Sequence, residues 1–318
     1  MATASKTQTR KLTSAPSIVP LYARAAIPLV PGASRLPFVP GGGGEIPDVR
    51  LELDGIVPDP DAVAAYAKVC GFTLRDSLPP TYPHVLAFPL HMALMSDGSF
   101  PFGAIGLVHI ANRIAQHRRL GIDEELSLRV QATKIAKHPK GRSFDLVTEV
   151  RVGRQIAWES TSTILSRGKG DLGAASGEAF PIIDEEVPAS AEWTLPGDLG
   201  RRYAAVSGDR NPIHMHSLTA KPLGFPSAIA HGMWTKARAL AALESRLPDA
   251  FAVDVRFRRP ILLPAKVEFA TRENRRNADT DGEIDFTVRG RGQKRGTRHL
   301  DGRITPVAAK PSPKGKAK

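Results

Sequence analysis

The feature that most constrains the fold is a set of segments in which apolar and polar residues alternate. Such alternation is typical of half-buried antiparallel strands. The alternating segments form two groups, one in each half of the chain. The first group follows an apolar run of helical character over residues 84–95, and the second follows a similar run over residues 231–246. The segments cover residues 126–132, 144–152 and 158–164 in the first half, and residues 251–257, 267–271 and 284–288 in the second half. The pattern predicts an α+β fold in which each half packs a long helix against an antiparallel sheet.

The two halves also resemble each other in sequence. Residues 65–71 match residues 202–208 at an offset of 137, and residues 83–87 match residues 226–230 at an offset of 143. A chance match between small, common residues is one explanation, since helix starts share composition. The shared order of elements favours a duplication, with the extra residues accommodated in a loop.

Charge and composition divide the chain further. The formal net charge is +12, and residues 1–44 contribute five of these positive charges while residues 307–318 contribute four. Pro-, Ser- and Ala-rich ends of this kind are typical of solvated tails. We therefore predict a basic flexible tail over residues 1–45 and a second basic tail over residues 307–318. Between them we predict a non-catalytic unit over residues 46–167, a linker over residues 168–192 and a catalytic unit over residues 193–306.

Composition excludes several classes of protein. The single cysteine, Cys70, excludes an intramolecular disulfide framework and a cysteine-rich zinc module, and is typical of a reducing compartment. The apolar stretches are shorter than the roughly 20 residues that a membrane span needs. Because the basic excess lies in the tails, it does not indicate nucleic-acid binding. We expect a cytoplasmic protein without a membrane span.

The segment that carries chemistry is residues 203–214, which reads Tyr-Ala-Ala-Val-Ser-Gly-Asp-Arg-Asn-Pro-Ile-His. Pro212 biases Asn211 away from helical geometry, so the chain forms a fixed bend there. Such a bend can aim the carboxylate of Asp209 and the imidazole of His214 into one cavity. One group can then hold a proton while the other accepts one, as the addition or removal of water requires.

A purely structural interpretation uses the same residues. Asn211 is a good N-cap, and Pro212 suits the first position of a helix because it needs no hydrogen-bond acceptor there. On that interpretation His214 is only a residue in the first helical turn.

The continuous string resembles the motif of the (R)-specific enoyl-thioester hydratase and dehydratase family, the MaoC-like or hydratase 2 group of the hotdog fold. That family continues with a segment such as Ala230-His231-Gly232-Met233 at the start of its central helix. The resemblance implies a double hotdog, two tandem units each with a long central helix wrapped by a curved antiparallel sheet. The layout is similar to that of actinobacterial dehydratases that act on 3-hydroxyacyl thioesters.

The resemblance also implies roles for individual residues. Asp209 and His214 would be the catalytic acid–base pair, and Asn211 would shape their hydrogen bonds. Gly232 would donate its backbone N–H to the thioester oxygen, a role that suits the start of a helix because free N–H groups and a positive dipole end gather there. The alternative for Gly232 is a glycine needed only for close packing of helix on sheet.

The first unit lacks this chemistry at the matching positions. At the offset of 137, Asp209 falls on Phe72 and His214 falls on Ser77; at the offset of 143, residues 231–232 fall on Phe88 and Pro89. We therefore expect the first unit to form the wall of an acyl tunnel that favours long or bulky chains.

The expected enzyme is an (R)-3-hydroxyacyl-thioester dehydratase, reversibly an enoyl-thioester hydratase, with no metal and no cofactor. Its substrate would be a thioester of coenzyme A or of acyl carrier protein. Arg256, Arg258, Arg259 and the basic hairpin over residues 294–298 could meet phosphates or an acidic carrier, and the alternative is a solvated strand face. His214 and His216 could suggest a metal, but no carboxylate or thiol cluster accompanies them in the sequence.

Three questions stay open from sequence alone. A hotdog thioesterase would use a similar cavity to hydrolyse the thioester, and a catalytically silent acyl-binding subunit would keep the fold without turnover. Hotdog units pair sheet to sheet, which this chain could satisfy internally or by forming a homodimer.

Overall fold

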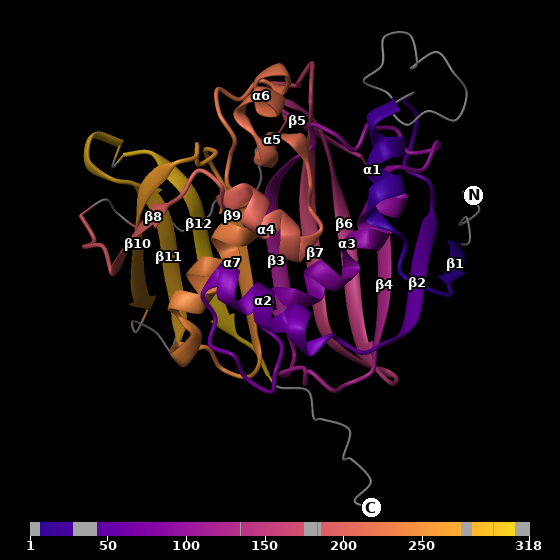
Figure 1. The fold of residues 1–318 in the computed structure, drawn as a ribbon, viewed down its shortest axis with the longest axis horizontal. Helices are drawn as coiled ribbons and strands as arrows, with labels where there is room; N and C mark the ends of the chain where they lie inside the picture. The colour runs from indigo at the N-terminus through magenta and orange to yellow at the C-terminus, as the bar shows by residue number, and fades with distance from the viewer. Residues whose placement is uncertain are drawn as a thin grey trace, which may run out of the picture.

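A single sheet runs through the molecule from one edge to the other (Figure 1). The computed structural model describes residues 7–27, 43–133, 135–174, 183, 186–274, 282–294 and 296–308. Within them the strand order is β1-β2-β4-β6-β7-β3-β9-β12-β11-β10-β8, and β5 pairs with β6 outside this path. The strands are β1 Gln8–Leu12, β2 Val49–Ile56, β3 Val108–Gln116, β4 Leu126–Ala132, β5 Ala136–His138, β6 Gly141–Val152, β7 Gln155–Arg167, β8 Ala191–Leu195, β9 Phe251–Phe257, β10 Ala265–Asn274, β11 Glu283–Gly290 and β12 Arg298–Pro306.

The strand order demonstrates the internal duplication. The first unit runs β2-β4-β6-β7-β3 across the sheet, and the second runs β8-β10-β11-β12-β9. With β1 and the short β5 left out, the strands of each unit lie across the sheet in the order first, third, fourth, fifth and second, numbered along the chain. The two units meet where β3 pairs antiparallel with β9, from Ala111 opposite Arg256 to Gln116 opposite Phe251.

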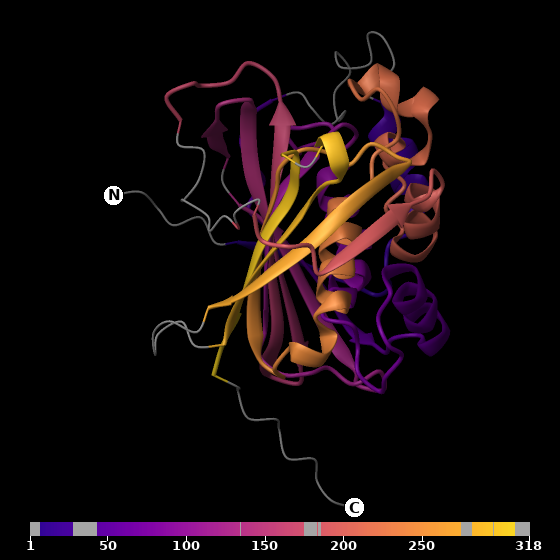
Figure 2. The same ribbon diagram turned by 90° about the vertical axis from the view of Figure 1, so that its left-hand side faces the viewer.

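The helices gather on one side of the curved sheet (Figure 2). They are α1 Ile18–Ala26, α2 Pro60–Cys70, α3 Tyr82–Met95, α4 Leu199–Ser207, α5 Pro212–Met215, α6 Ser217–Ala220 and α7 Gly232–Ala242, with 3-10 turns η3 Lys221–Leu223, η4 Glu244–Arg246 and η5 Gly292–Lys294. α3 and α7 are the two predicted central helices, and the second of these ends earlier than predicted, with η4 completing the run. The α+β double hotdog is confirmed.

The N-terminal segment differs from the predicted flexible tail. β1 pairs in parallel with β2, from Gln8 opposite Val49 to Leu12 opposite Leu53, and α1 packs beside α3. The segment carries several positive charges, but the spacing of Ile18, Leu21, Tyr22 and Ala25 is that of one buried helical face. These side chains belong to or pack against an apolar cluster of the first unit. The predicted tail over residues 1–6 and 28–42 lies outside the described residues.

The predicted linker is described in part, and the predicted C-terminal tail lies largely outside the described residues. Residues 168–174, 183 and 186–190 of the linker are described, and β8 begins at Ala191, inside the predicted linker range. At the C-terminus the N–H of Val307 donates to the carbonyl oxygen of Ala250 at 3.3 Å, and residues 309–318 are not described. No helix in the described ranges has the length and hydropathy to cross a bilayer.

A buried lysine secures the junction between the two units. The side chain of Lys236 extends from α7 and is fully buried. Its Nζ donates to the Asn112 Oδ1 at 2.5 Å, to the Asn112 carbonyl oxygen at 3.2 Å and to the Val253 carbonyl oxygen at 3.1 Å. An ammonium group has three donors, and here all three have acceptors. The Asn112 amide in turn donates to Ser160 and Ser162 of β7, so a polar network links α7, β3, β7 and β9.

Replacing this lysine should destabilise the whole molecule. Lys236→Ala removes the three hydrogen bonds and leaves buried acceptors at the β3–β9 pairing, so we expect the free energy of unfolding to fall by about 3 kcal/mol. Chemical denaturation of the purified protein measures this loss. The matched control is Lys266→Ala on an exposed part of β10, which should change stability by no more than about 0.5 kcal/mol. Equal effects of the two substitutions would refute the role given to Lys236.

Candidate active site

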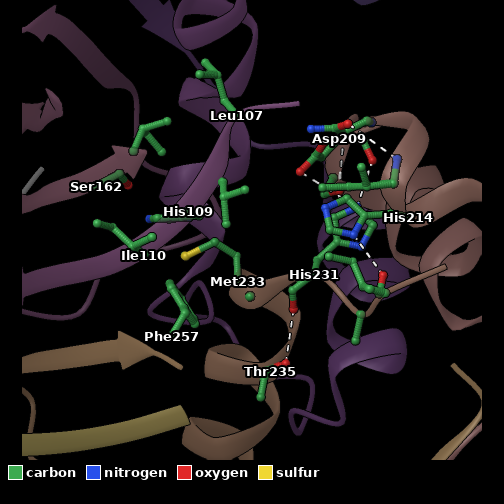
Figure 3. A pocket seen from close by; sticks show the side chains of 18 of the residues that line it. Leu107, His109, Ile110, Ser162, Asp209, His214, His231, Met233, Thr235 and Phe257 are labelled. Atoms are coloured by element: carbon green, nitrogen blue, oxygen red, sulfur yellow. Dashed lines mark hydrogen bonds and ion pairs between the residues drawn. The ribbon is translucent and has the colours of Figure 1, made fainter. Parts of the chain in front are cut away.

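One cavity lies where the two units meet, and both units line it (Figure 3). The second unit contributes polar groups that include Asp209, His214 and His231. Opposite them, the first unit contributes a wall that is mainly apolar. Its lining residues include Val85, Phe88, Met92, Met95, Leu107, Ile110, Leu146 and Ile164.

The bend that carries the motif forms between α4 and α5. α4 ends at Ser207, and Gly208 takes a left-handed conformation with φ of 75°, which favours glycine. Asn211 then begins α5 as its N-cap, with its side-chain oxygen accepting the N–H of Ile213 at 3.5 Å, and Pro212 occupies the first helical position. The capping interpretation of Asn211 is therefore correct, and the same cap fixes the bend.

Asp209 and His214 converge at this bend. Together with His231, they place one oxygen or nitrogen each within 4.8 Å of one another (Figure 3). The Asp209 Oδ1 accepts the N–H of Asn211 at 3.1 Å and the hydroxyl of Tyr22 at 3.0 Å. The His214 Nδ1 lies 2.8 Å from the carbonyl oxygen of Ile229. A carbonyl oxygen only accepts, so Nδ1 carries the proton and the neutral ring keeps an acceptor at Nε2.

The surroundings of the pair set its protonation state. Burial raises the pKa of the Asp209 carboxyl, but His231, His214 and the hydrogen bonds from Asn211 and Tyr22 outweigh burial and leave that pKa below its usual value. Burial lowers the pKa of His214, and the nearby Asp209 carboxylate opposes this shift only in part. At neutral pH the site therefore holds an ionised carboxylate beside a neutral imidazole.

His231 is a site residue that the sequence reasoning did not select. Its ring stacks on that of His214 with centroids 3.7 Å apart, and its Nε2 lies 3.0 Å from the backbone oxygen of Asp209. Burial, followed by the proximity of His214, lowers the pKa of His231 to about 3. The sequence signal for His231 is its place directly before Gly232 in the segment of residues 230–233. Asp209, His214 and His231 are also the described residues whose spacing could hold a metal ion.

Gly232 is the first residue of α7 and lines the cavity. Its backbone N–H belongs to the first turn, where such groups have no acceptor within the helix. A Cβ at this position would lie 3.0 Å from the ring of Phe257, so close packing also favours glycine. Both interpretations of Gly232 are compatible with the structure, and its contact with a substrate oxygen stays a prediction.

Tyr22 is the second residue that the sequence reasoning missed. It lines the cavity from α1, inside the segment predicted to be a tail. Its hydroxyl bonds to Asp209 and also accepts the backbone N–H of Arg210 at 2.8 Å. No local pattern around residue 22 indicates this contact, because its partners lie 187 and 188 positions away.

The first unit has the expected apolar character at the duplicated positions. Phe88, which aligns with His231, lines the cavity, and Phe72, which aligns with Asp209, is buried in the core. Three other histidines of this unit, His84, His91 and His109, also line the cavity and lie close together. The ring of His84 is 5.1 Å from that of His91 and 6.2 Å from that of His109.

The arginines predicted to meet phosphates separate into two groups. Arg258 and Arg259 are exposed and line the cavity, and the Nε of Arg258 donates to the Asp301 Oδ2 at 2.8 Å. Arg298 instead donates to the carbonyl oxygen of Ile183 at 2.6 Å and lies near Asp301, and neither it nor Arg256 lines the cavity.

Comparisons of the sequence and of the structure with known proteins find the same group of dehydratases. Residues 179–292 match the family described as MaoC like domain. The chain is 40% identical over 261 residues to 3-hydroxyacyl-thioester dehydratase X of Mycobacterium tuberculosis, and the match covers 81% of this chain and 89% of that relative. The crystal structure of HtdX from the same organism aligns with a TM-score of 0.71 at 36% identity, over 81% of this chain and 100% of that one. A MaoC-like dehydratase from Phytophthora capsici, 18% identical over 81% of this chain and 95% of its own, shares the fold with a TM-score of 0.65.

The buried histidines make the stability of the protein depend on pH. Burial lowers the pKa of His84 to about 4, below the value of 6.5 expected in the unfolded chain. Between these values the unfolded chain binds the extra proton, so stability should fall as the pH falls. Each such histidine contributes a slope of up to about 1.4 kcal/mol per pH unit. In His84→Phe the slope of unfolding free energy against pH, measured by denaturation between pH 6.5 and pH 4, should decrease by about that amount.

The control for this measurement is His216→Asn, which keeps a residue able to cap α6 and replaces a histidine outside the buried cluster. The control should keep the slope of the wild type. A His84→Phe protein with an unchanged slope would show that His84 is protonated as readily in the folded chain as in the unfolded one.

Proposed function

The chain belongs to the MaoC-like dehydratase family, and on that premise we propose that it removes water from (R)-3-hydroxyacyl thioesters and, in reverse, adds water to trans-2-enoyl thioesters. The observation that carries the proposal is the convergence of Asp209 and His214 on one cavity. 3-Hydroxyacyl-thioester dehydratase X, the relative that covers most of this chain, has the corresponding activity in its name.

The first requirement of the reaction is an acidic α-carbon. We propose that the thioester carbonyl oxygen accepts the N–H of Gly232, at the start of α7. Negative charge that builds on this oxygen during enolate formation is then stabilised by a fixed donor and by the positive end of the helix dipole. The absence of a side chain on Gly232 lets the carbonyl group approach closely.

The second requirement is a path for the proton. In the hydration direction a water molecule would sit between the Nε2 of His214 and the Oδ2 of Asp209, which are the unfilled acceptors of the pair. As the water oxygen bonds to the β-carbon, its proton passes to the pair, which then protonates the α-carbon. Dehydration reverses these steps, with water as the second product. Because both acceptors lie on one side of the cavity, we expect the hydroxyl group and the proton of water to add to the same face of the substrate.

The shape and charge of the cavity suggest the substrate class. The apolar wall supplied by α3 and neighbouring strands suits a longer acyl chain, which extends the tunnel hypothesis to named residues such as Met92 and Met95. The exposed Arg259, and the terminal nitrogens of Arg258 beyond the Nε that Asp301 engages, are suited to phosphates of coenzyme A or of a carrier protein. We further propose a cytoplasmic enzyme, because its single cysteine, Cys70, is free and buried.

Removing either member of the pair should abolish most of the activity. In Asp209→Asn and His214→Ala we expect turnover of an enoyl-coenzyme A to fall by about 10²–10⁴, because proton transfer loses its donor or acceptor. Loss of enoyl-thioester absorbance measures the rate. His216→Asn, next to the motif, should retain wild-type turnover. An Asp209→Asn enzyme of near-normal rate would overturn the assignment, and release of free thiol by the wild type would favour a thioesterase.

The acyl wall should set chain-length preference. The wild type should show a higher kcat/KM for enoyl thioesters of ten or more carbons than for the four-carbon substrate, by about tenfold or more, because each buried methylene adds about 0.8 kcal/mol. Met95→Trp puts a larger side chain into the acyl cavity. It should reduce kcat/KM for thioesters of ten or more carbons and leave kcat/KM for the four-carbon thioester unchanged. A wild type that prefers the four-carbon thioester would exclude the long-chain proposal.

A further inference from the structure

The N-terminal helix brings a hydroxyl group to the proposed catalytic carboxylate. The Tyr22 hydroxyl donates to the Asp209 Oδ1 at 3.0 Å and accepts the N–H of Arg210 at 2.8 Å. It therefore contacts both the side chain of Asp209 and the backbone of the residue that follows. Burial and the adjacent carboxylate raise the pKa of the Tyr22 phenol, so it stays protonated and acts as the donor.

The helix that carries Tyr22 is held firmly. β1, before it, pairs with β2 over five residues of the sheet edge. Ala25 is only 1% exposed, and Ile18 packs beside Gly208, with its Cγ1 3.6 Å from the position that a Cβ would take there. β1 thus ties the segment to the sheet, and Ile18 ties α1 to the bend that carries Asp209. Such support is what keeps the hydrogen bond from Tyr22 to Asp209 aligned.

The two oxygens of the Asp209 carboxylate differ in their surroundings. Oδ1 accepts from Tyr22 and from the N–H of Asn211. Oδ2 has His231 at 3.8 Å, beyond hydrogen-bond distance. Titratable groups face Asp209 from every element around it, and they are Tyr22 of α1, His84 of α3, His109 of β3, Tyr203 of α4, His214 of α5 and His231 before α7. Tyr22 is the one in this group that donates a hydrogen bond to the Asp209 carboxylate.

We propose that Tyr22 is a positioning residue of the active site, which holds the Oδ1 of Asp209 and thereby turns Oδ2 towards the reacting water. This inference rests on the proposed function, and it adds Tyr22 of α1 to the active site. A donor to a carboxylate also favours its ionised form, so loss of the hydroxyl should make Asp209 easier to protonate.

The test is Tyr22→Phe, which removes the hydroxyl and keeps the ring. We expect kcat/KM for an enoyl-coenzyme A to fall by about tenfold or more, with the change mainly in kcat, because a hydrogen bond to a charged group is lost. The acid limb of the profile of kcat/KM against pH should move upward, because the reaction needs ionised Asp209 together with neutral His214 and the lost hydrogen bond makes this pair easier to protonate. A tyrosine that only supports packing would not move that limb.

The control is Leu21→Ala, which weakens the packing of α1 on the apolar cluster but keeps the Tyr22 hydroxyl. It should keep the acid limb of the wild type. An unchanged rate and pH profile in Tyr22→Phe, or the same upward shift in Leu21→Ala, would overturn the proposal.

A second measurement separates this inference from the proposed function. The carboxyl carbon of Asp209, assigned by comparison with Asp209→Asn, can be titrated by NMR in the wild type and in Tyr22→Phe without any turnover. We expect a higher pKa in Tyr22→Phe. If the wild type failed to hydrate enoyl thioesters, the proposed function would fall, while this titration would still decide whether Tyr22 controls Asp209; equal pKa values would show that it does not.

Discussion

The antiparallel pairing of β3 with β9 is the constraint on which the rest of the structure depends. It joins two half-sheets of identical topology into one, and so brings α3 and α7 to the same side of a continuous surface. The cavity exists because these two units meet there. The second unit supplies the proposed catalytic groups, and the first unit supplies a mainly apolar wall that also contains His84, His91 and His109. Lys236 reinforces the same junction from within, since its ammonium group binds acceptors on both β3 and β9. A duplicated fold can therefore keep one reactive half and use the other half to enclose the acyl chain.

The second unit's side of the cavity concentrates groups that are costly to bury. A carboxylate and two imidazole rings share a small space, and their burial is tolerable only if their polar atoms find partners. Backbone groups supply most of them, through Asn211 for the carboxylate and Ile229 for His214, so the arrangement depends on the bend being rigid. Three side-chain atoms of this group keep no hydrogen-bond partner among the described residues, and they are the Nδ1 of His231, the Oδ2 of Asp209 and the Nε2 of His214. The last two are the atoms that the proposed reaction uses.

Features encoded by neighbouring residues could be predicted from the sequence. Strand alternation and two apolar helical runs predicted an α+β fold of two helix-and-sheet units. The unbroken motif that ends at His214, through its resemblance to a known family, implied the double hotdog and singled out Asp209 and Asn211 as candidates. Contacts across the fold could not be found in that way. Tyr22 reaches Asp209 only after β1 joins the sheet, and His231 joins the site only when α7 docks beside the bend. Net charge was a misleading guide to the N-terminal segment, because a helix with one buried face can carry several positive charges on its exposed side.

Addition of water from one side of the substrate is the central claim of this mechanism, and its stereochemistry is directly measurable. The wild-type enzyme would convert a trans-2-enoyl-coenzyme A in deuterium oxide, and NMR would define the configuration of the product at both new centres. We predict an (R)-3-hydroxyacyl-coenzyme A with one deuterium at the α-carbon, added to the same face as the oxygen. Addition to opposite faces, an (S)-product or free coenzyme A in place of the hydroxyacyl thioester would contradict the assignment of Asp209 and His214 as a single proton-transfer pair.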